Sequence, residues 1–174
     1  MSDIKKYTAQ IRDVQFGTGV TVVEPLNLYE CEIGNDVFVG PFVEIQKGVK
    51  IGDRTRIQSH TFICELVTIG SDCFIAHGVM FTNDLFKEGG PSGNDKSKWS
   101  STEIGNHVSI GSNVTLLPVT VCDNVVIGAG AVVTKNIIII NVIMYLATLA
   151  FETVNIDLVK LFGLHYYLAD DDHI

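Results

Sequence analysis

The sequence predicts an all-β fold in which short strands and tight corners wind into a parallel β-helix. From Ile33 onward, an aliphatic residue recurs at every sixth position, and Phe81 closes the run. Four positions after each of these comes a small or β-branched residue, and turn-forming pairs such as Asn35-Asp36 fall between. A period of six matches neither the 3.6 of a helix nor the alternation of a lone strand. It fits a short strand followed by a corner, with three sides in each coil.

The same phase continues in a second block, after an insertion. The inward positions resume at Ile104 and run to Val133, with one five-residue step near Pro118. The inward residue due at position 87 comes at 104, so 104 − 87 = 17 residues are inserted. This Gly-, Ser- and Lys-rich segment, taken as 85–101, is predicted to leave the coil as an extended loop. Long loops on a rigid scaffold usually carry function. The segment from Val20 to Leu28 is interpreted as a less regular first coil.

Two regions follow from this pattern: a β-helix domain over 1–136 and an atypical hydrophobic tail over 137–174. The apolar run from Ile137 to Phe151 is too short, and too interrupted by Asn141, for a membrane span. Two interpretations of the tail stay open. It is either a native segment that packs over the end of the coil or a segment translated in a shifted reading frame.

Composition narrows the class of protein. The formal net charge is −8, whereas a nucleic-acid-binding protein would show a basic face, so no nucleic-acid partner is expected. The four cysteines form no Cys-x-x-Cys pair, which disfavours a zinc or redox motif. The N-terminus has no apolar stretch of the signal-peptide type. We therefore expect a reduced, cytoplasmic protein.

Four segments resemble the hexapeptide-repeat acyltransferases, and within them the N-acetyltransferases of nucleotide-linked amino sugars. The segments are Gly40–Gln46, Ser59–Cys64, His77–Asp84 and Ile127–Lys135. The resemblance implies a left-handed parallel β-helix and a homotrimer with sites between subunits. It also implies acetyl-CoA as co-substrate, no metal, and a UDP- or dTDP-linked 3-amino-deoxyhexose as acceptor, for surface polysaccharide synthesis. The tail departs from the family's usual ending, so no tail contact with CoA is carried over.

The expected catalytic residues come from two corners of the coil. Residues 18 apart stack on neighbouring coils, which places Glu65 and Asn83 in one column at the root of the loop. Amide and carboxylate groups suit the orientation of an amine and the removal of its proton. His60 stands at a second corner as a candidate base. An amine that is already neutral needs no dedicated base, so an essential role for histidine stays open.

Further residues are expected to bind the two substrates. His77, Asp84 and Gln58 are assigned to the acceptor. The cofactor residues are the bare positions Gly111, Gly128 and Ala129, where pantetheine could approach the backbone, together with Lys135 for a phosphate and Trp99 for stacking or for pinning the loop.

Three rival functions are compatible with a β-helix fold. A γ-type carbonic anhydrase needs three histidine ligands, two of them close in sequence, and His60, His77 and His107 offer no such pair. A non-catalytic β-helix scaffold would not need the loop or the polar column at its root. An O-acetyltransferase would need a histidine base more than an N-acetyltransferase does, because a hydroxyl is less nucleophilic than an amine.

Overall fold

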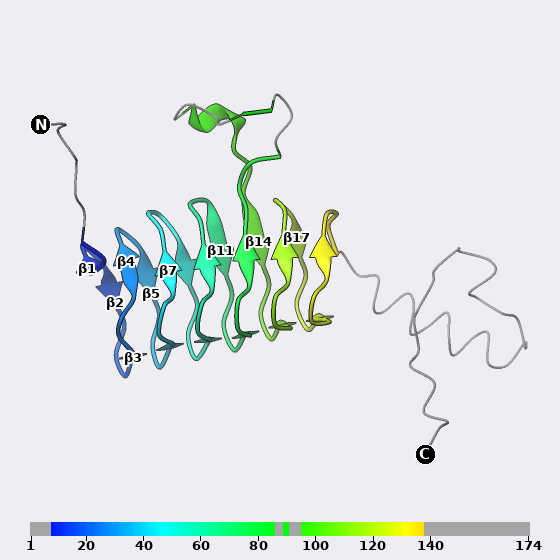
Figure 1. Cartoon of the computed structure of the whole chain (residues 1–174). Helices are drawn as coiled ribbons and strands as arrows, with labels where there is room; N and C mark the ends of the chain where they lie inside the picture. The colour runs from blue at the N-terminus through cyan, green and yellow to red at the C-terminus, as the bar shows by residue number, and fades with distance from the viewer. Residues whose placement is uncertain (1–7, 86–88, 91–94, 138–174) are drawn as a thin grey trace, which may run out of the picture. The chain divides into compact units, whose positions relative to one another are not determined.

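The protein is a left-handed parallel β-helix, seen in a computed structural model that describes residues 8–85, 89–90 and 95–137 (Figure 1). Its strands form three parallel sheets, each with one strand per coil. Sheet A contains β1 (Ile11–Arg12), β4 (Asn27–Tyr29), β7 (Glu44–Ile45), β10 (Phe62–Ile63), β13 (Met80–Phe81), β16 (Thr115–Leu116) and β19 (Val132–Val133). Sheet B contains β2 (Gln15–Phe16), β5 (Glu32–Ile33), β8 (Lys50–Ile51), β11 (Val67–Ile69), β14 (Thr102–Ile104) and β17 (Thr120–Val121). Sheet C contains β3 (Thr21–Val22), β6 (Phe38–Val39), β9 (Arg56–Ile57), β12 (Phe74–Ile75), β15 (Ser109–Ile110) and β18 (Val126–Ile127).

The core consists of the predicted inward residues. Within the regular coils the second residue of each two-residue strand is buried, because successive side chains of a strand point to opposite faces of the sheet. Ile45, Ile57 and Ile75 are fully buried, and Phe81 closes the predicted run with no exposed surface. The small residue four positions later packs into the same core, as Val43, Val79 and their equivalents do.

The strand register confirms the predicted insertion. Ile51 pairs with Ile33 and Ile69 pairs with Ile51, so stacked residues are 18 positions apart. Across the insertion Ile69 pairs with Ile104, a separation of 35, which is one coil plus the 17 inserted residues. The excursion between β13 and β14 includes the short 3₁₀ helix η1 (Lys96–Lys98) and projects from one edge of the coil (Figure 1).

The coil begins earlier than the sequence indicated. The first rung is β1, in which Ile11 pairs with Leu28, and not the segment from Val20. The prediction missed it because the steps from Ile11 to Phe16 and from Leu28 to Ile33 are five residues each, which breaks the six-residue phase. At the other end Ile137 bridges Val121, one residue beyond the predicted domain. The rest of the predicted tail lies outside the described residues.

Three corners connect the sheets, and we name them by their contents. The loop corner lies between sheets A and B and carries Lys47, Glu65, Asn83 and Lys135. The ladder corner lies between sheets B and C and carries Asn35, Asp53, Ser71, Asn106 and Asp123. The histidine corner lies between sheets C and A and carries Ser59-His60 and His77-Gly78. Many corner residues adopt positive φ, among them His60 at 63° and Asp72 at 60°, a region that asparagine, aspartate and glycine tolerate best.

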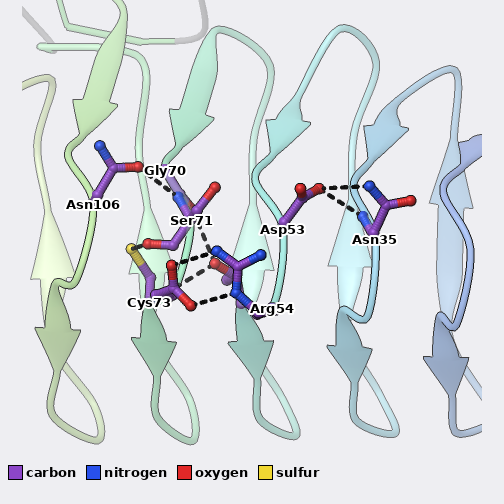
Figure 2. Close-up of polar contacts among 9 residues, drawn as sticks. Asn35, Asp53, Arg54, Gly70, Ser71, Cys73 and Asn106 are labelled. Atoms are coloured by element: carbon purple, nitrogen blue, oxygen red, sulfur yellow. Dashed lines mark hydrogen bonds and ion pairs between the residues drawn. The ribbon is translucent and has the colours of Figure 1, made fainter.

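Side-chain hydrogen bonds join successive coils at the ladder corner (Figure 2). Asp53 Oδ1 accepts from the backbone N–H of Asn35 at 2.7 Å and from its Nδ2 at 3.2 Å. Asn106 Oδ1 accepts from the backbone N–H of Ser71 at 2.9 Å. Arg54 donates from Nε and from a terminal nitrogen to the two oxygens of Asp72, each at 2.7 Å. The corner's polar residues therefore serve coil stacking.

Candidate active site

Asn83 and Glu65 are brought together at the loop corner, as the column predicted. The Asn83 side chain donates from Nδ2 to the Glu65 backbone carbonyl at 3.3 Å. The Ser100 backbone N–H donates to the Asn83 carbonyl at 2.8 Å, so both ends of the loop meet at this residue. A carboxamide has two N–H donors and one acceptor. Among the residues that the structure describes, the bond to Glu65 uses one of the two donors, so the amide has further hydrogen-bonding groups to offer a ligand.

An open hollow of about 380 Å³ lies beside this pair on the outer face of sheet A. Its floor comes from β10 and β13 and from the residues that follow them, and Trp99 of the loop also lines it. The lining residues are Gln46, Phe62, Cys64, Phe81, Thr82, Asn83, Asp84 and Trp99. The hollow thus combines an apolar floor with the amide of Asn83 and the carboxylate of Asp84, a composition typical of small-molecule sites.

The loop is attached to this hollow at two points. Trp99 is half-buried and forms an antiparallel bridge with Asp84. Lys96 of η1 forms an ion pair with the carboxylate of Glu65, and its Nζ lies 5.5 Å from the centre of the Trp99 ring. The Glu65 backbone N–H donates to Gln46 Oε1 at 3.3 Å, which ties the corner to the coil before it. Asp84 and Trp99 therefore both line this hollow, and their assignments to the acceptor and to the cofactor stay predictions.

The histidine corner holds a separate group of predicted residues. His60 and His77 lie on adjacent coils as expected, and both are exposed. They are not in one column, because His60 stacks on Phe42 with ring centroids 4.8 Å apart, whereas the Ser59 carbonyl accepts from the backbone N–H of Gly78 at 3.0 Å. Gln58 follows β9 and is half-buried just before the same corner.

The predicted cofactor residues are divided between two corners. Gly111 and Gly128 stack on successive coils beside the histidine corner, with Ala129 following. A Cβ on Gly111 would lie 2.4 Å from the Ala129 backbone nitrogen, whereas one on Gly128 would meet nothing within 4 Å. Stacking of the coils therefore requires the first glycine, while the second leaves open surface. Lys135 is exposed at the loop corner.

A single chain does not bring the two groups into contact. His60 and Glu65 lie at opposite ends of the same side of the coil, five residues apart, which is about 16 Å at the rise of an extended strand. The predicted catalytic set of Asn83, Glu65 and His60 is thus divided between two corners of a single chain. His107 lies at the third corner, away from both.

Sequence reasoning missed Lys96 and Gln46. Lys96 lies within an insertion that has no repeat register, so no stacking argument could connect it with Glu65. Gln46 had a usable signal, because it follows a strand of sheet A at 18-residue spacing from Cys64 and Thr82.

Burial and neighbouring charges shift several pKa values at and near the loop corner. Burial, followed by the charges of Glu44 and Glu65, raises the pKa of Tyr29. A hydrogen bond from Lys47 lowers the pKa of Glu30 on the preceding coil, and these two side chains form an ion pair. Desolvation raises the pKa of the Cys64 thiol to about 12. This thiol stays protonated at neutral pH and offers no nucleophile to the hollow.

Within 8–85, 89–90 and 95–137, no group of three or more His, Cys, Asp or Glu side chains is arranged to hold a metal ion. No helix in these ranges is long and apolar enough to cross a membrane.

Known proteins share both the repeats and the fold. The profile described as bacterial transferase hexapeptide (six repeats) matches residues 30–65, and the hexapeptide repeat of succinyl-transferase matches residues 102–135. The bifunctional protein GlmU of Clostridium botulinum is 37% identical over 109 residues, which is 62% of this chain and 21% of that protein. GlmU of Clostridium acetobutylicum is 38% identical over 109 residues, which is again 62% of this chain and 21% of that protein. The chain thus spans about a fifth of these relatives.

A solved structure agrees at the level of the fold. A variant of AntD, an N-acyltransferase from Bacillus cereus crystallised with dTDP and coenzyme A, superposes with a TM-score of 0.55. It is 20% identical and covers 74% of each chain. With the repeats, the coil and these relatives taken together, the chain is similar to the hexapeptide-repeat acyltransferases.

Proposed function

We propose that the protein transfers an acetyl group from acetyl-CoA to the amine of a UDP- or dTDP-linked amino sugar. The observation that carries the proposal is the group formed by Asn83, Glu65 and Asp84 at the root of the inserted loop. Asn83 and Asp84 line a hollow large enough for part of a sugar, and the Asn83 side chain is hydrogen-bonded to the Glu65 carbonyl. AntD, which shares the fold, is an N-acyltransferase bound to dTDP and coenzyme A, and the same classes of ligand are proposed here. A 3-amino-deoxyhexose for surface polysaccharide is the acceptor class we favour.

The proposed chemistry needs an oriented, neutral amine. The amine nitrogen attacks the thioester carbonyl, the carbon–sulfur bond breaks, and CoA leaves as a thiol after taking up a proton. Asn83 would orient the amine or a neighbouring hydroxyl. Glu65 would hold the amine through its carboxylate and accept its proton through water. Correct placement alone can supply several orders of magnitude in rate, so neither residue must act as a strong base.

The second half-site would come from a neighbouring subunit. Gln58, His60 and His77 lie too far from Asn83 to act with it in one chain. In a homotrimer, however, the histidine corner of one subunit can face the loop corner of the next. The bare backbone at Gly128 and Ala129 would then receive pantetheine, with Lys135 and Trp99 contributing contacts to CoA. The expected compartment is the cytoplasm, where CoA and nucleotide sugars are made.

A substrate screen tests the proposal. Purified protein is incubated with acetyl-CoA and a panel of UDP- and dTDP-linked amino sugars, and free thiol release is followed with a chromogenic disulfide. The same nucleotide sugars with a hydroxyl in place of the amine serve as matched controls. Turnover with the amines alone supports the proposal. Turnover with the hydroxyl compounds would instead assign an O-acetyltransferase, and no turnover with any acceptor would favour a scaffold.

A further inference from the structure

The inserted loop brings a primary ammonium group of its own to the candidate site. Lys96 Nζ pairs with the Glu65 carboxylate and lies 5.5 Å from the centre of the Trp99 ring. A carboxylate opposite an aromatic ring is a general receptor for alkylammonium groups, because both the charge and the ring quadrupole attract a cation. Trp99 also lines the hollow assigned to the sugar.

We infer that Lys96 occupies, in the unliganded protein, the position that the ammonium of the acceptor takes when it binds. Lys96 is then an internal competitor, and it must leave Glu65 before the acceptor can pair with that carboxylate. The inference rests on the proposed function, since it requires an amine as acceptor. Lys96 is then a residue that tunes the selectivity of this site between an amine acceptor and a hydroxyl acceptor.

The two partners differ in how firmly they are held. Glu65 belongs to the coil: its backbone N–H is bonded to Gln46 and its carbonyl to Asn83. The Glu65 side chain is 20% exposed, whereas that of Lys96 is 56% exposed. Lys96 extends from a three-residue helix whose cap is a bond of 3.1 Å from the Ser97 N–H to Asp95 Oδ1. Glu65 is therefore the fixed member of the pair and Lys96 the exchangeable one.

The strength of the competition can be bounded. Partly exposed ion pairs contribute little because water and salt screen them. A ligand whose site is occupied part of the time binds more weakly in proportion to the fraction of time that the site is open. Removing Lys96 should therefore strengthen binding of an amine ligand by about two- to fivefold. A hydroxyl ligand carries no charge to place on Glu65 and should gain less.

Binding can be measured without turnover, because Trp99 is the single tryptophan of the chain. Its emission is titrated with dTDP-3-amino-3-deoxyglucose and with dTDP-glucose at constant ionic strength. The proteins are wild type, K96Q, K96R and K47Q. Lys47 is the matched control, because it makes the equivalent lysine–glutamate pair with Glu30 at the same corner. The quantity compared is the ratio of the two dissociation constants.

We expect the preference for the amine to rise about two- to fivefold in K96Q, and to stay at the wild-type value in K96R and K47Q. In a Glu65→Gln background, K96Q should change nothing further.

An unchanged or lower preference in K96Q, an equal rise in K47Q, or no binding of either ligand would overturn the inference. If K96Q weakens both ligands, Lys96 binds the nucleotide phosphates instead. Thiol release by the wild-type protein tests the proposed function separately. Thiol release with amino sugars alongside an unchanged preference in K96Q would overturn the inference and leave the proposed function standing.

Discussion

Asn83 combines two roles that separate mutations can distinguish. Its backbone carbonyl accepts from Ser100 and so closes the root of the loop, while its side chain reaches the Glu65 carbonyl. Only the second role involves the amide group. Removing the amide should therefore affect the chemistry more than the fold.

Asn83→Ala should lower kcat by roughly ten- to a thousandfold, or about 1.4–4 kcal/mol of activation free energy. The reason is that the amine gains positive charge as it attacks, so an orienting amide matters more in the transition state than in the ground state. The affinity for CoA should stay nearly unchanged. Steady-state kinetics with the acceptor identified by the screen, together with calorimetric titration of CoA, provide the measurements.

The control for this prediction is the pair His60→Ala and His77→Ala, which should cost less at alkaline pH, where the amine is already neutral. Full kcat/KM in Asn83→Ala together with an inactive histidine variant would contradict the prediction. The enzyme would then use a histidine base, and a hydroxyl acceptor would become the better assignment.

Cysteine reactivity is a second prediction at this scale. Burial raises the pKa of Cys31 to about 11 and that of Cys64 to about 12, and it also raises the pKa of Cys73. The thiolate is the reactive form, so these three should react with a chromogenic disulfide only after unfolding. Cys122 is half-exposed and should react first. Labelling of Cys64 in the folded protein at the rate seen for Cys122 would show that the core near the hollow opens.

Among the elements of the fold, the ladder corner shows why polar residues recur without a catalytic role. Each Asn or Asp bonds to the backbone of a neighbouring coil, as Asp53 does with Asn35. A column of glycines, which includes Gly52 and Gly70, lies between the strands of sheet B and the ladder corner. A Cβ on Gly52 would come within 2.5 Å of the backbone carbonyl carbon of Gly70. Replacing these glycines would separate the coils.

The Arg54–Asp72 pair gives a testable pH dependence. The hydrogen bond from Arg54 holds the pKa of Asp72 below its ordinary value of 3.8. A carboxyl group with a lowered pKa stabilises the fold above its unfolded-state pKa, and this contribution is lost as the pH falls through the folded-state pKa. Asp72→Asn should therefore lower Tm by no more than about 3 °C at pH 7, because the pair is exposed, and should leave Tm unchanged near pH 2.

Differential scanning calorimetry at the two pH values measures this effect. Glu103→Gln, a carboxylate change on the outer face of sheet B, is the control and should shift Tm equally at both. A Tm decrease for Asp72→Asn that persists at low pH would show that the side chain acts through packing or backbone geometry rather than charge.

Prediction from sequence succeeded wherever the six-residue phase holds and failed where it breaks. The inward residues from Ile33 to Phe81 and the column of Glu65 and Asn83 follow from spacing alone. The first rung at Ile11 was missed, because five-residue steps precede and follow it. The contact of Lys96 with Glu65 could not be predicted, since the loop has no repeat to fix its register. The assigned roles of the site residues stay predictions.

At the scale of the whole molecule, the three outer faces differ in polarity. Sheet B presents polar residues outward, including an ion pair between Lys50 and Glu32. Sheets A and C present exposed apolar side chains, with Met80 at 43%, Val132 at 63%, Phe74 at 41% and Val126 at 76% exposure. Large apolar patches mark interaction surfaces. A homotrimer that covers sheets A and C would leave sheet B in contact with water.

Sedimentation velocity should accordingly show a trimer. Met80→Lys and Phe74→Lys should shift it toward monomer and reduce acetyl transfer at least about tenfold, because a site between subunits would be lost. Thr68→Lys on the outer face of sheet B should leave both unchanged. A stable wild-type monomer with full activity would contradict the trimer.

Removal of the tail is a further prediction at this scale, although residues 138–174 lie outside the described part of the chain. If the tail is foreign to the fold, truncation after Ile137 should leave the circular dichroism of the coil intact. Solubility should increase, because most of a 15-residue apolar run is removed. Ile137 is kept because it is hydrogen-bonded to Thr120 and Cys122. Loss of folding on truncation would show that the tail caps the coil.

The departures from the six-residue period all fall at one corner. The short steps from Ile11 to Phe16, from Leu28 to Ile33 and from Leu116 to Val121, and the insertion after Phe81, lie between sheets A and B. At the other two corners every step from Phe16 to Val133 is six residues. The loop corner is thus a seam along which the chain gains or loses residues without disturbing coil stacking. Foreign peptides spliced in beside Gly48, where an added Cβ meets nothing within 4 Å, should be displayed by an intact scaffold, whereas the same splice at Ser59-His60 should abolish it.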